Sequence, residues 1–289
     1  MTDVGSGPQG RNSNDARGAG AHHHSMRILF IGDIHGKPGR RILTARLPEL
    51  RREHKLALVI ANGENSAGGA GISAEIAREL LASGVDAITG GNHTWQHRDA
   101  YELLDSDPRL LRPLNYPPGT PGRGATVVTT RTGSKVGVIN VQGRVFMAEL
   151  DDPFRAARAE CERLRDTTPV ILVDFHAEAT SEKIALGWYL DGRCSAVVGT
   201  HTHVQTADER VLPGGTAYIT DVGMTGPRDG VIGMDRERIL ERFLTQLPVR
   251  FEVAAGPAQL NAVVVDVDEE SGRARSISRI AEVEQASAD

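Results

Sequence analysis

Five short apolar runs, each followed by a polar side chain, constrain this chain more than any other feature. The runs cover residues 28–32, 56–61, 85–89, 170–175 and 194–198. Their length and their branched apolar residues are typical of buried strands. Stretches with the period of a helix alternate with these runs, which predicts βαβ units and a largely parallel sheet. The sequence therefore predicts an α/β fold.

The polar side chains after these runs all belong to residue types that bind divalent metals. In chain order they are Asp33, Glu64, Asn65, Asn92, His93, His176, His201 and His203. Open α/β sheets bind their ligands at the carboxyl ends of the strands. Carboxylate, amide and imidazole together suit manganese, iron or zinc. Any one such residue has a simpler interpretation, as a helix N-cap or a hydrogen-bonded core histidine, but the same chemistry at five strand ends favours a metal site.

The order of these residues resembles the motif blocks of the calcineurin-like metallophosphoesterases. The blocks are Gly32-Asp33, Gly63-Glu64-Asn65, Gly91-Asn92-His93, the isolated His176 and Gly199-Thr-His201-Thr-His203. Glu64-Asn65 stands where the superfamily has a bridging aspartate, and Thr94 stands where an acidic residue is common. Both departures resemble a bacterial branch, the 2',3'-cyclic-nucleotide 2'-phosphodiesterases. Longer strings match that branch as well, at residues 65–69, 112–115, 143–146 and 174–183.

The resemblance implies one metallophosphoesterase catalytic domain over residues 26–289. The implied fold is a four-layer αββα sandwich of α/β class with mixed sheets and the metals at one sheet edge. The sequence itself predicts a hairpin, because residues 125–130 and 135–141 flank a short loop that contains Gly. The segments expected to form a second sheet are this hairpin and residues 216–220, 250–253, 260–266 and 275–278.

Four helices are expected between the strands. The first covers about Gly39–Glu53, with Pro48 inside it as a kink or an early end. The second begins after Ser73, a good N-cap residue, and ends near Ala82. The third follows Gln96, and the fourth covers residues 153–165. Residues 1–25 contain almost no apolar side chains, so we expect a disordered N-terminal extension or a tag there.

By resemblance, the centre holds two divalent metal ions, with iron or manganese expected and zinc as the alternative. Glu64 bridges the ions; Asp33, Asn65 and His203 complete one site, and Asn92, His176 and His201 complete the other. Two such ions about 3.5–4 Å apart bind phosphate oxygens and deprotonate a bridging water. The predicted function is a dinuclear metal-dependent phosphodiesterase that uses a metal-bridging hydroxide. Its predicted substrates are 2',3'-cyclic nucleotides, with 3',5'-cyclic nucleotides as a further class.

Two further histidines are interpreted separately. The resemblance gives His93 the role of general acid, which suits a side chain that changes protonation near neutral pH; the alternative is a structural loop histidine. Asp33-Ile-His35 restores a superfamily pattern in which the histidine binds metal, whereas the cyclic-nucleotide branch usually has an apolar residue there. His35 is an extra metal ligand, a residue that contacts substrate, or a solvated loop residue, and the sequence leaves the three open.

A second class of function fits the same ligand set, namely a non-catalytic regulatory or scaffold protein with structural metals. An acid beside the metals favours the enzyme. A serine hydrolase is disfavoured because no Gly-x-Ser-x-Gly elbow is present. The net charge of −5 gives no basic surface for a nucleic acid. A small cyclic nucleotide or another phosphodiester is the expected partner, and a homo-oligomer is left open.

Composition agrees with an enzyme of the cytoplasm. The 289 residues, 39% of them hydrophobic, suffice for a large core. The chain has only two cysteines, Cys161 and Cys194, which is typical of reduced thiols. No apolar run of roughly 18 residues is present, so we expect no membrane-spanning helix.

Overall fold

The computed structural model describes residues 25–284, and its first sheet combines the N-terminal and C-terminal parts of the chain. Its strand order is β10-β11-β1-β2-β3, and β12 pairs with β11. The strands are β1 (Ser25–Ile31), β2 (Leu58–Asn62), β3 (Ala87–Thr89), β10 (Gly226–Pro227), β11 (Ala258–Asp268) and β12 (Ala274–Val283). Strands β1, β2 and β3 are parallel, whereas β11 runs antiparallel to β1. The expected extension over residues 1–25 lies outside the described residues, except that Ser25 begins β1.

The second sheet has the order β4-β5-β6-β7-β9-β8. Its strands are β4 (Ala125–Thr129), β5 (Lys135–Gln142), β6 (Ile171–His176), β7 (Ala196–Thr200), β8 (Arg210–Val211) and β9 (Ala217–Ile219). The four inner strands are parallel, and the edge strands β4 and β8 are antiparallel to their neighbours. The predicted hairpin of β4 and β5 is confirmed.

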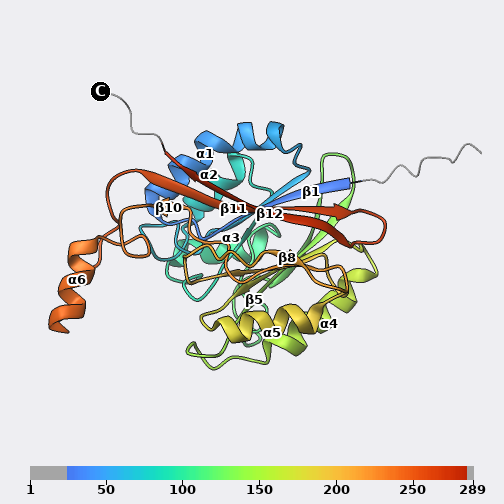
Figure 1. Cartoon of the computed structure of the whole chain (residues 1–289). Coiled ribbons are helices and arrows are strands. Elements are labelled where there is room, and N and C mark those ends of the chain that lie inside the picture. The colour runs from blue at the N-terminus through green and yellow to red at the C-terminus, as the bar shows by residue number, and fades with distance from the viewer. Residues whose placement is uncertain (1–24, 285–289) are drawn as a thin grey trace, which may run out of the picture.

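Helices cover the outer face of each sheet, so the molecule has the four layers that the resemblance implies (Figure 1). The helices over the first sheet are α1 (Gly36–Glu53), α2 (Ala74–Ala82) and α3 (Tyr101–Ser106), the last preceded by a short 3-10 turn, η1 (Arg98–Ala100). Those over the second sheet are α4 (Pro153–Arg165) and α5 (Thr180–Leu190). The αββα sandwich with mixed sheets is confirmed.

Strand β1 shows how alternation builds these layers. Ile28 and Phe30 pack between the two sheets, whereas Leu29 and Ile31 pack against the helices on the outer face. Successive side chains of a strand point to opposite faces, and here both faces are apolar because both are covered. Such strands position the loops at their carboxyl ends rigidly.

The local helix signals are confirmed in part. The Oγ atom of Ser73 accepts a hydrogen bond from the N–H of Ile76 at 3.2 Å, which caps α2 as expected. Helix α1 begins at Gly36, one turn before its predicted start, and runs through Pro48 to Glu53. Helix α5 is not predicted, because Gly187 interrupts its pattern; a Cβ there would lie 2.5 Å from the Tyr218 ring.

The assignment of strands to sheets differs from the prediction. Strands β6 and β7 belong to the second sheet, where β6 pairs in parallel with β5 of the hairpin. Strands β11 and β12 join the first sheet instead. Residues 250–253 are not a strand, although Val253 forms an isolated bridge with Met234. A strand buried on both faces carries no pattern that identifies its neighbour, so the pairing could not be deduced.

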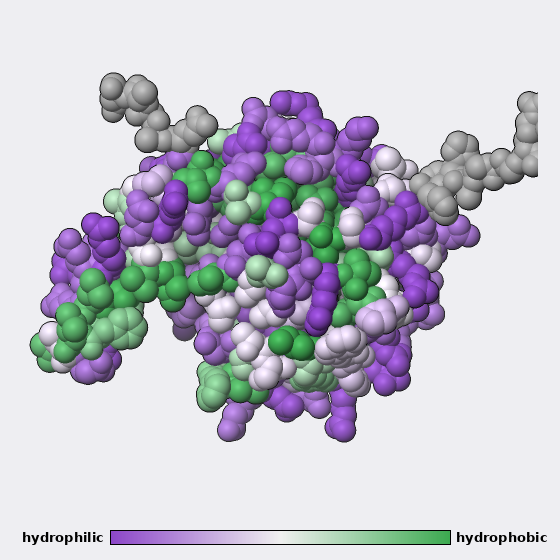
Figure 2. Space-filling view, viewed as in Figure 1, coloured by the Kyte–Doolittle hydropathy of each residue, from purple (hydrophilic) through white to green (hydrophobic). Residues whose placement is uncertain are grey.

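Helix α6 (Arg236–Thr245), which the sequence does not predict, stands away from the two sheets (Figure 1). Its exposed side chains Leu240, Phe243 and Leu244 belong to a continuous apolar surface on that arm (Figure 2).

None of the helices between residues 25 and 284 combines the length and the apolar composition that a membrane-spanning helix needs.

Candidate metal centre

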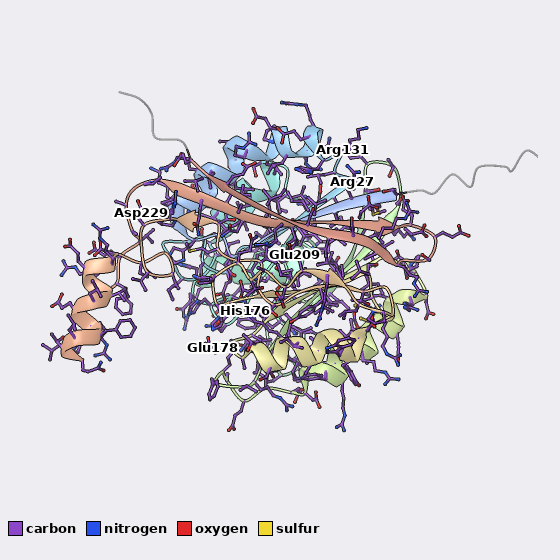
Figure 3. The ribbon with its side chains drawn as sticks, viewed as in Figure 1. Arg27, Arg131, His176, Glu178, Glu209 and Asp229 are labelled. Carbon is purple, nitrogen blue, oxygen red and sulfur yellow. The ribbon has the colours of Figure 1, made fainter. Side chains whose placement is uncertain are left out.

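The structure brings all the predicted site residues to one edge, at the carboxyl ends of parallel strands from both sheets. Asp33 follows β1, the pair Glu64 and Asn65 follows β2, and the pair Asn92 and His93 follows β3. From the second sheet, His176 ends β6, and His201 and His203 follow β7. Most of these side chains are buried, and a cleft of about 380 Å³ opens over them. Figure 3 shows His176 and Glu178 close together at this edge.

The tightest cluster is formed by Glu64, His176 and His201. One ligand atom from each residue lies within 4.8 Å of the other two. The Nε2 atom of His176 is 3.2 Å from the Oε1 atom of Glu64 and 3.0 Å from the Nδ1 atom of His201. The Oδ1 atom of Asn92 lies 2.9 Å from the same nitrogen. Four atoms that carry lone pairs therefore converge on one point.

An acceptor outside the cluster fixes the proton of each of the three histidines. The Nδ1–H of His203 donates to the carbonyl oxygen of Ile232 at 2.9 Å, because a carbonyl only accepts. The Nε2 atom of His201 lies 3.1 Å from a carboxylate oxygen of Glu178. The Nδ1 atom of His176 lies 2.9 Å from the hydroxyl of Thr200. Such outer acceptors orient imidazole ligands in metal sites.

The hydroxyl of Thr200 indicates which nitrogen of His176 carries the proton. Its hydroxyl proton goes to the Oδ1 atom of Asp174 at 2.8 Å, so the hydroxyl oxygen accepts from His176. When the ring of His176 is neutral, its Nε2 atom then carries a lone pair on the side of Glu64. In the neutral cluster the inward nitrogens of all three imidazoles are acceptors, which is the state in which histidine binds a metal.

Two further observations show that the residues fit divalent cations. The Oδ1 atom of Asp33 is buried and has no hydrogen-bond partner among the described residues, and a buried carboxylate oxygen without a hydrogen bond is costly. Gly91 leaves the space open, because a Cβ there would lie 2.3 Å from Glu64 Oε2 and 2.4 Å from His176 Nε2. Carboxylate, amide and imidazole donors without thiolate suit manganese, iron or zinc.

Electrostatics leads to the same conclusion. Burial lowers the pKa of His176, but the charge and hydrogen bond of Glu64 outweigh it and raise the pKa to about 9. Burial raises the pKa of Glu64, but His176 and His93 hold it well below its usual range. Burial and the adjacent His176 lower the pKa of His201 to about 3. A fixed negative charge on Glu64 thus requires one positive charge beside it, which a proton supplies here and a metal cation can supply instead.

The histidine loop after β7 is strained. His201 and His203 have φ values of 97° and 66°, a region that costs side chains other than glycine roughly 1–3 kcal/mol each. Asp221 holds the loop by accepting hydrogen bonds from the N–H and the hydroxyl of Thr202, at 3.1 and 2.6 Å. Lys183 of α5 donates to the same carboxylate at 2.7 Å, and both charges are buried.

Replacing Lys183 by Met is expected to lower the free energy of unfolding by about 3–5 kcal/mol, because Asp221 is left as a buried charge without its cation. Denaturant unfolding measures this change. The control is Lys135→Met, at an exposed lysine of β5, for which about 0.5 kcal/mol or less is expected. Equal effects in the two variants would show that the ion pair does not hold the loop.

His35 is not a solvated loop residue, because it is 1% exposed. Neither of its ring nitrogens has a hydrogen-bond partner within the part of the chain that the structure describes. Its ring packs edge-on against His203, with the centroids 5.6 Å apart, and it lines the cleft. Burial and the adjacent His203 lower its pKa to about 4, so the ring is neutral near pH 7. The two remaining interpretations are a metal ligand and a substrate contact.

Replacing His35 by Val is expected to weaken metal binding by roughly 10- to 100-fold, the range for residues that support metal ligands. The variant should be as stable as the wild type, because an apolar side chain replaces a buried polar group that has no hydrogen-bond partner in the described residues. Metal titration and thermal unfolding measure the two effects. Unchanged metal affinity with a raised KM would identify a substrate contact instead.

Several residues of the centre do not follow from the sequence patterns. Glu178, Lys183 and Asp221 each contact a predicted ligand or its loop, yet none directly follows an apolar run. For Glu178 and Lys183 a signal exists, because both lie in the string at residues 174–183 that matches the resembled branch. Asp221 lies in the turn after the short strand β9, where the sequence pattern does not distinguish it from an ordinary turn residue.

Comparisons with known proteins show the family and agree with the fold. A model of the family described as YmdB-like protein matches residues 29–280. The chain is 56% identical over 255 residues to the 2',3'-cyclic-nucleotide 2'-phosphodiesterase of Bacillus subtilis (strain 168), covering 88% of this chain and 96% of that protein. A solved hypothetical protein from Thermus thermophilus has a TM-score of 0.84 and 48% identity, covering 90% and 100% of the two chains. A phosphatase from Mycoplasma pneumoniae has a TM-score of 0.86 and 35% identity, covering 92% and 96%.

Proposed function

This chain belongs to the family of YmdB-like proteins, and we propose that it is a metal-dependent phosphodiesterase that hydrolyses 2',3'-cyclic nucleotides at the 2' ester bond. The observation that carries the proposal is the pair of imidazoles of His176 and His201, each anchored outward, whose inward nitrogens cluster with Glu64. His203 is anchored in the same way, and its inward nitrogen lies 3.3 Å from the side-chain nitrogen of Asn65. The name of the Bacillus subtilis relative supplies the substrate class. We include 3',5'-cyclic nucleotides as a further class, because they present the same phosphodiester group.

Two divalent cations fit the ligand set, with iron or manganese proposed and zinc as the alternative. Glu64 is proposed to serve both ions, with Asp33, Asn65 and His203 on one side and Asn92, His176 and His201 on the other. When bound, such ions neutralise phosphate charge and make a water molecule nucleophilic. Thr200, Glu178 and the Ile232 carbonyl keep the imidazoles oriented, and Asp174 in turn holds the hydroxyl of Thr200.

His93 is proposed to donate the proton to the leaving oxygen. Its Nδ1 atom lies 2.9 Å from the side-chain carbonyl of Asn65, and its backbone N–H donates to Glu64 at 3.1 Å. Because these contacts occupy the Nδ1 side of the ring, the Nε2 atom remains for the substrate. The side chain is 34% exposed and lines the cleft, as an acid that meets a substrate must.

The orientation of the Asn65 amide bears on its proposed role as a metal ligand. Its Nδ2 atom lies 2.8 Å from Glu64 Oε1 and 3.3 Å from His203 Nε2, both lone-pair atoms. A metal ion held between Glu64 and His203 would need the side-chain oxygen of Asn65 on that side, because the amide nitrogen has no lone pair to donate. The amide would therefore be turned by half a rotation. The nitrogen would then face His93 Nδ1.

The second candidate function is a non-catalytic scaffold with structural metals. The open position of His93 argues against it, because a scaffold gains nothing from a partly exposed imidazole beside buried ligands. Glu178 is also half exposed in the same cleft. Structural metal sites are closed to substrate, whereas catalytic sites keep an open position.

Hydrolysis assays on the full chain test the proposal. Purified protein with added manganese or iron should hydrolyse 2',3'-cyclic AMP and bis-p-nitrophenyl phosphate, and chelation should remove both activities. Metal content measured in parallel should rise and fall with activity. Bound metal without hydrolysis of any phosphodiester would favour the scaffold.

We also propose that the enzyme acts in the cytoplasm as one catalytic domain over residues 26–289. Cys161 and Cys194 are both buried free thiols. They are close enough that Cys161, together with burial, holds the pKa of Cys194 well above its usual range. A chain with two buried cysteines and no disulfide between them fits a reducing compartment.

A further inference from the structure

The cleft over the metal centre is unusual for a phosphate site, because no lysine or arginine of the described chain lines it. Its lining consists of His35, Glu64, Asn65, Gly69, His93, Glu178, His201, Thr202, His203, Ile232 and Met234. Two of these residues are carboxylates. Glu64 is 1% exposed and faces the ligand cluster, whereas the side chain of Glu178 is 48% exposed. Glu178 is thus the one anionic side chain of the lining that faces the open cleft.

The charge of Glu178 is held in place. Its Oε2 atom lies 3.1 Å from the Nε2 atom of His201, whose Nδ1 atom points into the cluster. Glu178 lies in the short connection between β6, which ends at His176, and α5, which begins at Thr180. Figure 3 shows its side chain beside His176 at the edge of the sheets. A carboxylate fixed there acts on any anion that reaches the centre.

We propose that Glu178 makes the centre selective for phosphodiesters with one negative charge over phosphomonoesters with two, a specificity that rests on the proposed phosphodiesterase function. Every ligand experiences the repulsion of this carboxylate in proportion to its own charge, and partial burial keeps water from screening it fully. Specificity that is built from a repulsive element is a general device of binding sites. The metal ions attract both kinds of ester, and Glu178 sets the difference between them.

The same charge acts on the product. Hydrolysis of a cyclic nucleotide forms one P–O bond from water and breaks the bond to the ribose oxygen, which takes a proton. The monoester that results releases a further proton near neutral pH and so carries one more negative charge than the substrate. Glu178 therefore favours release of the product and opposes a second hydrolysis to the free nucleoside.

Glu178→Gln separates charge from orientation. Glutamine keeps an oxygen that accepts the Nε2–H of His201 but removes the negative charge. Two esters with the same leaving group isolate the effect of substrate charge. Methyl p-nitrophenyl phosphate has one negative charge, whereas p-nitrophenyl phosphate has two near pH 8. We expect kcat/KM for the monoester, relative to the diester, to rise about tenfold in Glu178→Gln. Inhibition by inorganic phosphate should strengthen to a similar degree, and bound metal should be unchanged.

Two control variants accompany this test. Glu178→Asp keeps the charge and should keep the wild-type ratio of the two activities. Glu53→Gln removes the same charge from a side chain that is 55% exposed at the far end of α1, about 27 Å along the helix from its start at the centre. That variant should leave the ratio unchanged.

An unchanged ratio in Glu178→Gln, or loss of metal with an equal fall for both esters, would overturn the proposal and leave Glu178 as a support for His201. Failure of the proposed function gives a different result, since metal-loaded wild-type protein would then hydrolyse neither ester. In that case, the affinity for inorganic phosphate, measured by calorimetry, still reports the effect of the Glu178 charge. Equal affinity of wild type and Glu178→Gln would refute charge selection without any catalysis.

Discussion

Replacing Glu64 by Gln is expected to reduce turnover by roughly 10³-fold or more and to release at least one metal ion. Glutamine has the same size as glutamate, so the cavity stays filled. The substitution removes the negative charge next to the inward nitrogen of His176, 3.2 Å away. A neutral amide offers one oxygen and cannot serve two cations. Metal content by mass spectrometry and hydrolysis of 2',3'-cyclic AMP measure the two effects.

Glu182→Gln is the matched control for this substitution. Glu182 is also a buried glutamate, but it accepts hydrogen bonds from the backbone N–H groups of Arg144 and Val145 and bonds to no imidazole within residues 25–284. Its substitution should lower stability and leave the metal content intact. If Glu64→Gln instead retains two metal ions and turns over at nearly the normal rate, the bridging role is wrong.

The sequence predicts the positions of the site residues well, because geometry leaves them little freedom. Asp33, Glu64 and His176 follow buried apolar strands, and the carboxyl ends of parallel strands meet at one edge. This holds even though the sequence places β6 in the wrong sheet, since both sheets direct their parallel strands to the same edge. Strand ends are local features, whereas the pairing of strands is set by contacts between distant segments.

The residues that orient the ligands are harder to predict for the same reason. Glu178 reaches His201 across two loops, and Lys183 reaches Asp221 from a helix to the turn after β9. No periodicity joins such partners, since each contact depends on how the helix packs on the second sheet. His35 shows the limit in the other direction: the Gly-rich turn after it leaves a solvated loop residue as one interpretation, yet the backbone at Gly69, Gly226 and Gly233 packs against its side chain and buries it.

Replacing His93 by Ala is expected to slow hydrolysis of a cyclic nucleotide by roughly 10²–10⁴-fold, the range that positioned acid catalysis supplies. The same variant should hydrolyse bis-p-nitrophenyl phosphate at nearly the normal rate. The ribose oxygen is a poor leaving group and needs a proton as the bond breaks, whereas p-nitrophenolate leaves without one. The kcat of each substrate, with the metal content, separates this role from a ligand role.

His97→Ala is the control, because His97 lies four residues away and bonds to the carbonyl of Ala70 at 3.1 Å rather than to a site residue. This variant should hydrolyse both substrates at the wild-type rate. An equal loss on both substrates in His93→Ala would contradict acid catalysis, and a missing metal ion would make His93 a ligand. The contacts of its ring favour the unequal loss, since Asn65 and Glu64 occupy the Nδ1 side and leave Nε2 toward the cleft. A ligand would turn its free nitrogen toward the cluster, whereas a general acid turns it toward the substrate.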